Sequence, residues 1–142
     1  MGTSSLILKA QSREEIFADK LVAFALRPNR LKNRDLWDIA WLHQLQIKPA
    51  LELINNKLND HQAKSETYLK AFVERTVSLK NDPTTAKDFR SEMSRFLPSA
   101  TVKETVNSDS FWEYLGNLIM NYQHQLVQAL EGSEQQPTKF KM

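Results

Sequence analysis

Lys20 is the residue whose setting most clearly requires a chemical partner. Apolar residues surround it in the sequence, among them Phe17, Leu21 and Phe24, on a segment with helical spacing. A lysine ammonium is rarely buried unless it is paired, so it must reach water, meet a carboxylate or face a bound anion. The pattern alone favours a salt bridge or a solvent-exposed ammonium, with contact to a bound anion as the alternative.

Two carboxylates follow at a spacing that brings them together. Asp35 and Asp38 are three positions apart, which places both on one face of a helix. Such a pair can bind a hard cation through its oxygens. Acidic residues in the first turn of a helix also stabilise its N-terminus, and Arg34 can pair with either carboxylate. Spacing alone favours this capping role over a chemical one.

Basic residues are concentrated just before these carboxylates. Four of them fall within eight positions: Arg27, Arg30, Lys32 and Arg34. Guanidinium and ammonium groups bind phosphates, so the segment could contact a nucleotide or an RNA backbone. A solvated loop is the alternative interpretation.

Aromatic and imidazole side chains add little chemical specificity. Trp37, Trp41 and Trp112 could stack on bases, but their helical spacing is more typical of a core. The three histidines show no His-x-x-x-His spacing, so we expect no zinc site.

These residues must be positioned by helices. The sequence predicts a mainly α fold, a bundle of about five or six helices with at most one short N-terminal strand at Leu6–Leu8. Apolar spacing and Pro or Asn breaks place the helices at about 13–27, 34–46, 48–60, 63–79, 85–96 and 110–130. Ser12 and Glu15 predict a capping box for the first helix, Asn33 or Asp35 an N-cap for the second, and Gly132 a C-terminal cap for the last. We divide the chain into a strand or arm (1–11), a helical domain (12–131) and a disordered tail (132–142).

Composition excludes several classes of protein. The chain has 142 residues, no cysteine and a net charge of only +2, so disulfide scaffolds, cysteine nucleophiles and a strongly basic nucleic-acid surface are not expected. No secretory signal or apolar run of bilayer length is visible, and we expect a soluble cytoplasmic protein that does not contact membranes.

Two motifs resemble one protein family. Residues 12–23, SREEIFADKLVA, are similar to a helix of AbiEii/AbiGii-type nucleotidyltransferase toxins, and residues 33–39, NRDLWDI, resemble the family's second motif, Arg-Asp-x-x-Asp. The two motifs occur in the family's order at a plausible separation. The resemblance implies a bacterial toxin of toxin–antitoxin and phage-defence systems that transfers a nucleotide to an acceptor, in some members a tRNA end.

The resemblance also implies roles for individual residues. Lys20 matches the lysine that contacts nucleotide phosphates. Arg27 and Arg34 are further phosphate-binding candidates from the basic segment and not from the resemblance. Asp35 and Asp38 match the two motif aspartates and are the catalytic candidates, Asp38 equally in a structural role. We expect no metal site and no cofactor in this chain alone, and Mg²⁺ with a nucleoside triphosphate if a missing half is supplied.

The family's Gly-Ser motif and its downstream Asp-x-Asp pair have no counterpart in the sequence. Because nucleotidyl transfer uses carboxylate-held metal ions, we expect a partial, C-terminal toxin domain that is inactive alone. The expected partners are an antitoxin or an upstream nucleotidyltransferase half, with a homodimer and RNA, such as tRNA, as further options. The alternative function is a helical protein-interaction module that binds an antitoxin or itself.

Overall fold

The computed structural model describes residues 11–140, with side chains placed for residues 11–131, and every regular element in this range is helical. The elements in chain order are α2 (Arg13–Leu26), α3 (Asn33–Gln44), the 3-10 turn η1 (Leu51–Leu53), α4 (Ile54–Asp60), α5 (Ser65–Asn81), α6 (Pro83–Phe96), α7 (Ser99–Thr101), the π-helical turn η2 (Val102–Val106) and α8 (Asp109–Phe140). The predicted mainly α fold is confirmed.

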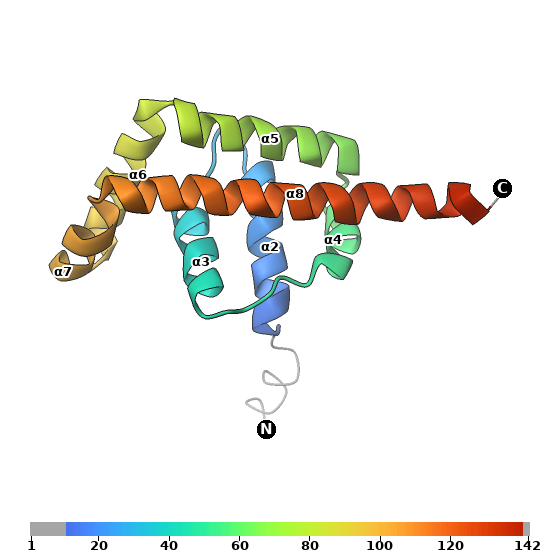
Figure 1. Ribbon diagram of the computed structural model, residues 1–142, viewed down its shortest axis with the longest axis horizontal. Coiled ribbons are helices and arrows are strands. Elements are labelled where there is room, and N and C mark those ends of the chain that lie inside the picture. Colours follow the sequence, from blue (N-terminus) through green and yellow to red (C-terminus); the bar gives the residue numbers. More distant parts are fainter. Residues whose placement is uncertain (1–10, 141–142) are drawn as a thin grey trace, which may run out of the picture.

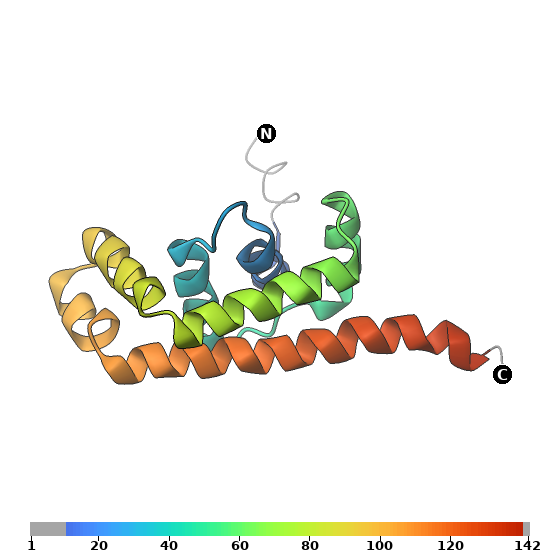
Figure 2. The same cartoon turned by 90° about the horizontal axis from the view of Figure 1, so that it is seen from above.

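Two long helices form the frame of the molecule. α8 runs along its full length, and α5 packs against α8 in the opposite direction (Figure 1). α2 and α3 cross this pair steeply, side by side and antiparallel, and Figure 2 shows both nearly end-on. α4 lies near one end of α5, and α6, α7 and η2 lie near the other end (Figure 1).

α2 is the central helix because it is apolar on most of its circumference. Phe17, Leu21 and Phe24 are fully buried, and the helix contacts α3, α4 and α5. Ser12 caps its N-terminus by accepting a hydrogen bond from the Glu15 N–H at 3.1 Å, as predicted. The Glu15 side chain, predicted to return to this cap, instead pairs with Lys57.

Two other expectations about helix ends are wrong. α3 has Lys32 at its N-cap without a side-chain capping bond, so neither Asn33 nor Asp35 caps it. The helix predicted from residue 48 begins later, because the Ala50 N–H donates to the Glu14 carbonyl of α2 at 3.0 Å. That contact holds the 45–50 segment in a non-helical conformation until η1.

The chain between α6 and α8 was not predicted to contain a helix. It forms α7 and η2 instead, and η2 buries Val102 and Val106 against the core. Their spacing of four residues is the helical signal that the prediction overlooked.

α8 continues to Phe140, so Gly132 lies within the helix and does not end it. The predicted strand at Leu6–Leu8 lies outside the described residues. So do the side chains of the predicted 132–142 tail, whose disorder stays a prediction.

No helix within residues 11–140 has both the length and the apolar content that a bilayer span requires.

Candidate functional site

Four charged side chains meet in one cluster. One comes from α2, one from the C-cap residue of α2 and two from α3. Lys20 Nζ lies 3.2 Å from Asp35 Oδ1 and 2.8 Å from Asp38 Oδ2. Arg27 donates to the same Asp35 carboxylate, Nε to Oδ2 at 2.9 Å and Nη2 to Oδ1 at 3.4 Å. The structure therefore brings together Lys20, Arg27, Asp35 and Asp38, four of the five residues predicted from the sequence.

The helical register explains why these side chains meet. Lys20 and Arg27 are seven residues apart, which is close to two helical turns, so they share one face of α2 and its C-cap. Asp35 and Asp38 share one face at the start of α3. Antiparallel packing of α2 on α3 places the two faces opposite each other.

Asp35 is the buried centre of the cluster, with a side chain only 2% exposed. Burial alone would raise the pKa of Asp35, but hydrogen bonds from Arg27 and Lys20, together with their charges, hold this pKa below its usual value. Partial burial would lower the pKa of Lys20, and contacts with Asp38 and Asp35 outweigh it and raise that pKa. The hydrogen bond with Asp35 likewise raises the pKa of Arg27. All three groups are therefore charged at neutral pH.

The ammonium of Lys20 bridges the two carboxylates. Lys20 Nζ bonds one oxygen of each, so an ammonium occupies the position that a bridging cation would take. Both oxygens of Asp35 are already engaged by cations. In the part of the chain with described side chains, no group of three or more histidines and carboxylates could hold a metal ion. The arrangement suits a positioning role for Asp35, and a catalytic role for Asp35 and Asp38 stays a prediction.

Arg34 is not part of this cluster. It is exposed, and its guanidinium carbon lies 5.2 Å from the centre of the Phe96 ring on α6, a cation–π contact. Asp35 follows Arg34 in sequence, but consecutive helical residues point about 100° apart, which separates the two side chains.

The cations of the cluster line a pocket of about 400 Å³ beside α2. Its remaining lining residues are Asp19, Ala23, Leu26, Pro28 and His61. Lys20 is 26% exposed and Arg27 40% exposed, so both can reach a ligand while they stay paired with Asp35. Asp19 is held by Lys57 at 2.7 Å, which offsets its negative charge.

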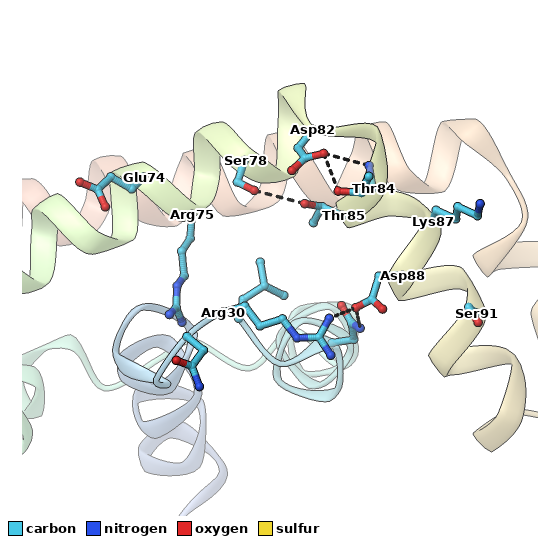
Figure 3. A pocket seen from close by; sticks show the side chains of 13 residues that line it. Arg30, Glu74, Arg75, Ser78, Asp82, Thr84, Thr85, Lys87, Asp88 and Ser91 are labelled. Carbon is cyan, nitrogen blue, oxygen red and sulfur yellow. Dashed lines mark hydrogen bonds and ion pairs between the residues drawn. The ribbon is translucent and has the colours of Figure 1, made fainter.

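A larger polar pocket of about 730 Å³ lies on the other side of the α2–α3 loop, between α5 and α6 (Figure 3). Arg30 reaches across it and pairs with Asp88 of α6 (Figure 3). The buried Asn33 amide donates to Asp88 at 3.0 Å and to Glu92 at 2.8 Å. Arg27, Arg30 and Arg34 thus have different partners and do not form one basic patch.

Arg75 of α5 contacts the chain beside the cluster, and the sequence did not reveal this residue. Figure 3 shows it reaching from α5 towards the α2–α3 loop. Its guanidinium donates to the Phe24 carbonyl at 2.8 Å and to the Arg27 carbonyl, so it caps the C-terminus of α2. Burial lowers the pKa of Arg75. Only an interruption in the apolar pattern of α5 signals this residue, and it does not identify the partner.

The tryptophans are mainly structural. Trp37 packs on Phe111, and Trp112 packs on Phe89 and donates to the Leu79 carbonyl at 3.2 Å. Trp41 is 51% exposed and lines an apolar groove of about 460 Å³. Trp37, Ala40, Gln44, Thr105, Phe111 and Tyr114 complete the groove.

One comparison with known proteins gives a match. A family model described as "Nucleotidyl transferase AbiEii toxin, Type IV TA system" matches residues 3–117. No curated protein and no solved structure matches the chain. The matched range contains α2 and α3 with the whole charged cluster.

Proposed function

The chain belongs to the AbiEii family of nucleotidyl transferase toxins of type IV toxin–antitoxin systems, and on that premise we propose that its charged cluster forms the phosphate-binding part of a nucleotide site. The observation that carries the proposal is the placement of Lys20 and Arg27 side by side on one pocket. The buried carboxylate of Asp35 forms ion pairs with Lys20 and Arg27 and positions both cations. A fixed, partly desolvated pair of cations is well suited to phosphate oxygens.

The net charge of the cluster indicates which carboxylate a bound phosphate would replace. Lys20, Arg27, Asp35 and Asp38 sum to zero, so the cluster has no surplus positive charge to offer. Asp38 is the more exposed of the two carboxylates, at 39% against 2% for Asp35, and ion pairs open to solvent contribute little free energy. A phosphate therefore displaces Asp38 from Lys20, and Asp35 stays in place.

We propose further that these 142 residues do not transfer nucleotides by themselves. The sequence contains no Asp-x-Asp pair, and the ammonium of Lys20 separates Asp35 from Asp38. Nucleotidyl transfer uses metal ions held by carboxylates, and these would come from a nucleotidyltransferase half that carries the Asp-x-Asp pair. Mg²⁺ and the triphosphate would bind to the combined site, with RNA such as a tRNA end as the acceptor.

Thermal unfolding with ligand tests the phosphate site, because a ligand that binds the folded state raises its stability. Nucleoside triphosphate at millimolar concentration should raise the Tm of the chain, and Lys20→Ala and Arg27→Ala should each abolish this rise. Arg90→Gln is the matched control, because it also removes an ion pair, with Asp109 at 2.8 Å, away from the pocket. No rise in the unmodified chain, or an equal loss in the control, would reject the proposal.

Labelled nucleotide, Mg²⁺ and tRNA test the proposed inactivity. We expect no transfer by the chain alone and transfer once the nucleotidyltransferase half is added. Transfer by the 142 residues alone would contradict the proposal.

The apolar groove at Trp41 favours a second candidate function, a protein-interaction module. A half-exposed tryptophan beside Phe111 and Tyr114 has the composition of an interface hot spot. The family description names a toxin–antitoxin system, so an antitoxin is the first partner to test, and a second copy of the chain is the next. Loss of antitoxin binding or of self-association in Trp41→Ser would support this function. Unchanged association would exclude the groove.

A further inference from the structure

The pocket beside Lys20 has features that a phosphate site alone does not need. Ala23, Leu26 and Pro28 give it an apolar part, and His61 adds an imidazole from the turn that follows α4. Inorganic phosphate is fully recognised by cations and hydrogen-bond donors. Apolar surface beside a few charged groups is instead typical of pockets that bind an organic ligand, and about 400 Å³ is within the usual size range.

His61 is free to contact a ligand. Its imidazole is exposed and makes no hydrogen bond, ion pair or ring contact within the described residues. Its backbone is fixed, because the His61 N–H donates to the Lys57 and Leu58 carbonyls at 3.2 and 3.1 Å. The next residue, Gln62, has a φ of 56° and reverses the chain there. Because the backbone is already fixed, stacking on a ligand would cost only the rotamer freedom of the His61 side chain.

We propose that this pocket binds the nucleoside part of a nucleoside triphosphate, with the base on the Leu26–Pro28 surface and stacked on the His61 ring. The inference rests on the proposed phosphate site at Lys20 and Arg27 and extends it to the nucleoside. Aromatic side chains stack on any base, so His61 selects for a nucleoside and discriminates little among the bases.

The remaining charged group of the pocket does not oppose this arrangement. Asp19 Oδ1 is paired with Lys57, and Asp19 Oδ2 accepts from the Gln11 amide at 2.8 Å. Glu15 pairs with the same lysine at 3.1 Å. Asp19 is therefore held back towards α4 and does not compete with phosphate for Lys20.

Calorimetric titration with four nucleoside triphosphates and with inorganic tripolyphosphate tests the inference. The nucleotides should bind about 5- to 10-fold more tightly than tripolyphosphate, the lower part of the range for stacking on an aromatic side chain. His61→Ala should remove this difference and leave tripolyphosphate affinity unchanged, and His61→Phe should keep it. Because His61 is exposed, the unfolding temperature of each variant should match that of the parent.

A proton NMR signal gives a second, independent readout. The imidazole resonance that disappears in His61→Ala identifies His61 among the three histidines. This resonance should shift upfield with ATP, through the ring current of the stacked base, and stay in place with tripolyphosphate.

Two outcomes would overturn the inference while leaving the phosphate site intact. These are equal affinity for nucleotides and tripolyphosphate, and an equal weakening of both by His61→Ala. Failure of tripolyphosphate to bind, or binding that is insensitive to Lys20→Ala, would instead reject the phosphate site and the inference with it.

Discussion

Asp35 carries a full negative charge in the interior only because Lys20 and Arg27 compensate it. Asp35→Asn keeps the shape but removes the charge that both cations need. We expect it to lower the free energy of unfolding by about 2–4 kcal/mol at pH 7. This is slightly less than the usual cost of breaking a fully buried ion pair, because both cations partly reach water. Urea titration measures this loss.

The pH dependence of the same variant has a defined sign. The folded pKa of Asp35 lies below its unfolded value of about 4, so its stabilisation is fully present above that pH. It is lost as the pH falls through the folded pKa. The stability difference between the parent chain and Asp35→Asn should therefore be constant from pH 7 to 5 and shrink below about pH 4. A difference that grows in acid would show that Asp35 is not the charged, paired group described here.

Asp38 has the same partner but a different environment. Since it is 39% exposed, Asp38→Asn should cost less than about 1 kcal/mol of stability. The substitution frees Lys20 from one of its two carboxylates and should raise tripolyphosphate affinity severalfold. Equilibrium binding at one ionic strength measures the change, because salt screens these charges. Weaker binding would instead assign Asp38 a direct role with the ligand, as its match to the family motif implies.

At the scale of elements, the C-terminus of α2 is held by a side chain from α5. Arg75→Met should lower the free energy of unfolding by about 1.5–3 kcal/mol, the usual contribution of hydrogen bonds from a charged donor. It should also weaken phosphate binding, because the Arg27 backbone loses its support. Urea titration and tripolyphosphate binding measure the two effects.

Arg75→Lys is the control for this prediction. It keeps the charge near the helix end but cannot donate to both carbonyls with a planar group, so its stability should be intermediate. If Arg75→Lys is as unstable as Arg75→Met, the charge alone contributes nothing, and if it is as stable as the parent chain, the planar guanidinium is not required.

The sequence predicts those elements whose signals are local. α2 and α3 were expected because their apolar spacing, the Ser12 cap and the proline after α2 act within a few residues. The meeting of Lys20 with Asp35 and Asp38 was not predicted as such, because a salt bridge of Lys20 was considered without a named partner. It follows from register once α2 and α3 pack as an antiparallel pair.

What the sequence missed depends on contacts across the fold. The late start of the helix after Pro49 follows from the bond between Ala50 and Glu14. Arg34 was grouped with Arg27 because they are near in sequence, but its partner is Phe96, more than sixty positions away along the chain. The role of Arg75 likewise requires knowing that α5 passes over the end of α2.

At the scale of the molecule, α8 and α5 act as one support for the helices that carry the cluster. α5 contributes Tyr68, whose hydroxyl donates to the Leu21 carbonyl of α2 at 2.9 Å. It also contributes Arg75, which donates to the Phe24 carbonyl near the C-terminus of α2. α8 contributes Tyr122, which packs edge-on against Phe17. The Tyr122 hydroxyl and His43 Nδ1 share a hydrogen bond of 2.9 Å. Burial raises the pKa of Tyr122 to about 12, so its hydroxyl stays neutral in this contact. The geometry around Lys20 therefore depends on helices far from it in sequence.

This dependence predicts where α8 can be shortened. Tyr122, Leu126 and Leu130 are at most 4% exposed, and all three lie before residue 131. A chain of residues 1–131 keeps every buried position described in α8, so its free energy of unfolding should change by less than about 1 kcal/mol.

A chain of residues 1–121 loses all three side chains. At about 1.5–3 kcal/mol for each, the loss approaches the whole stability of an ordinary domain. Thermal melts followed by circular dichroism should show a cooperative transition for the longer chain and none for the shorter one. Cooperative folding of residues 1–121 would mean that α2 and α3 are held without the second half of α8, and that the cluster at Lys20 is a property of the first helices alone.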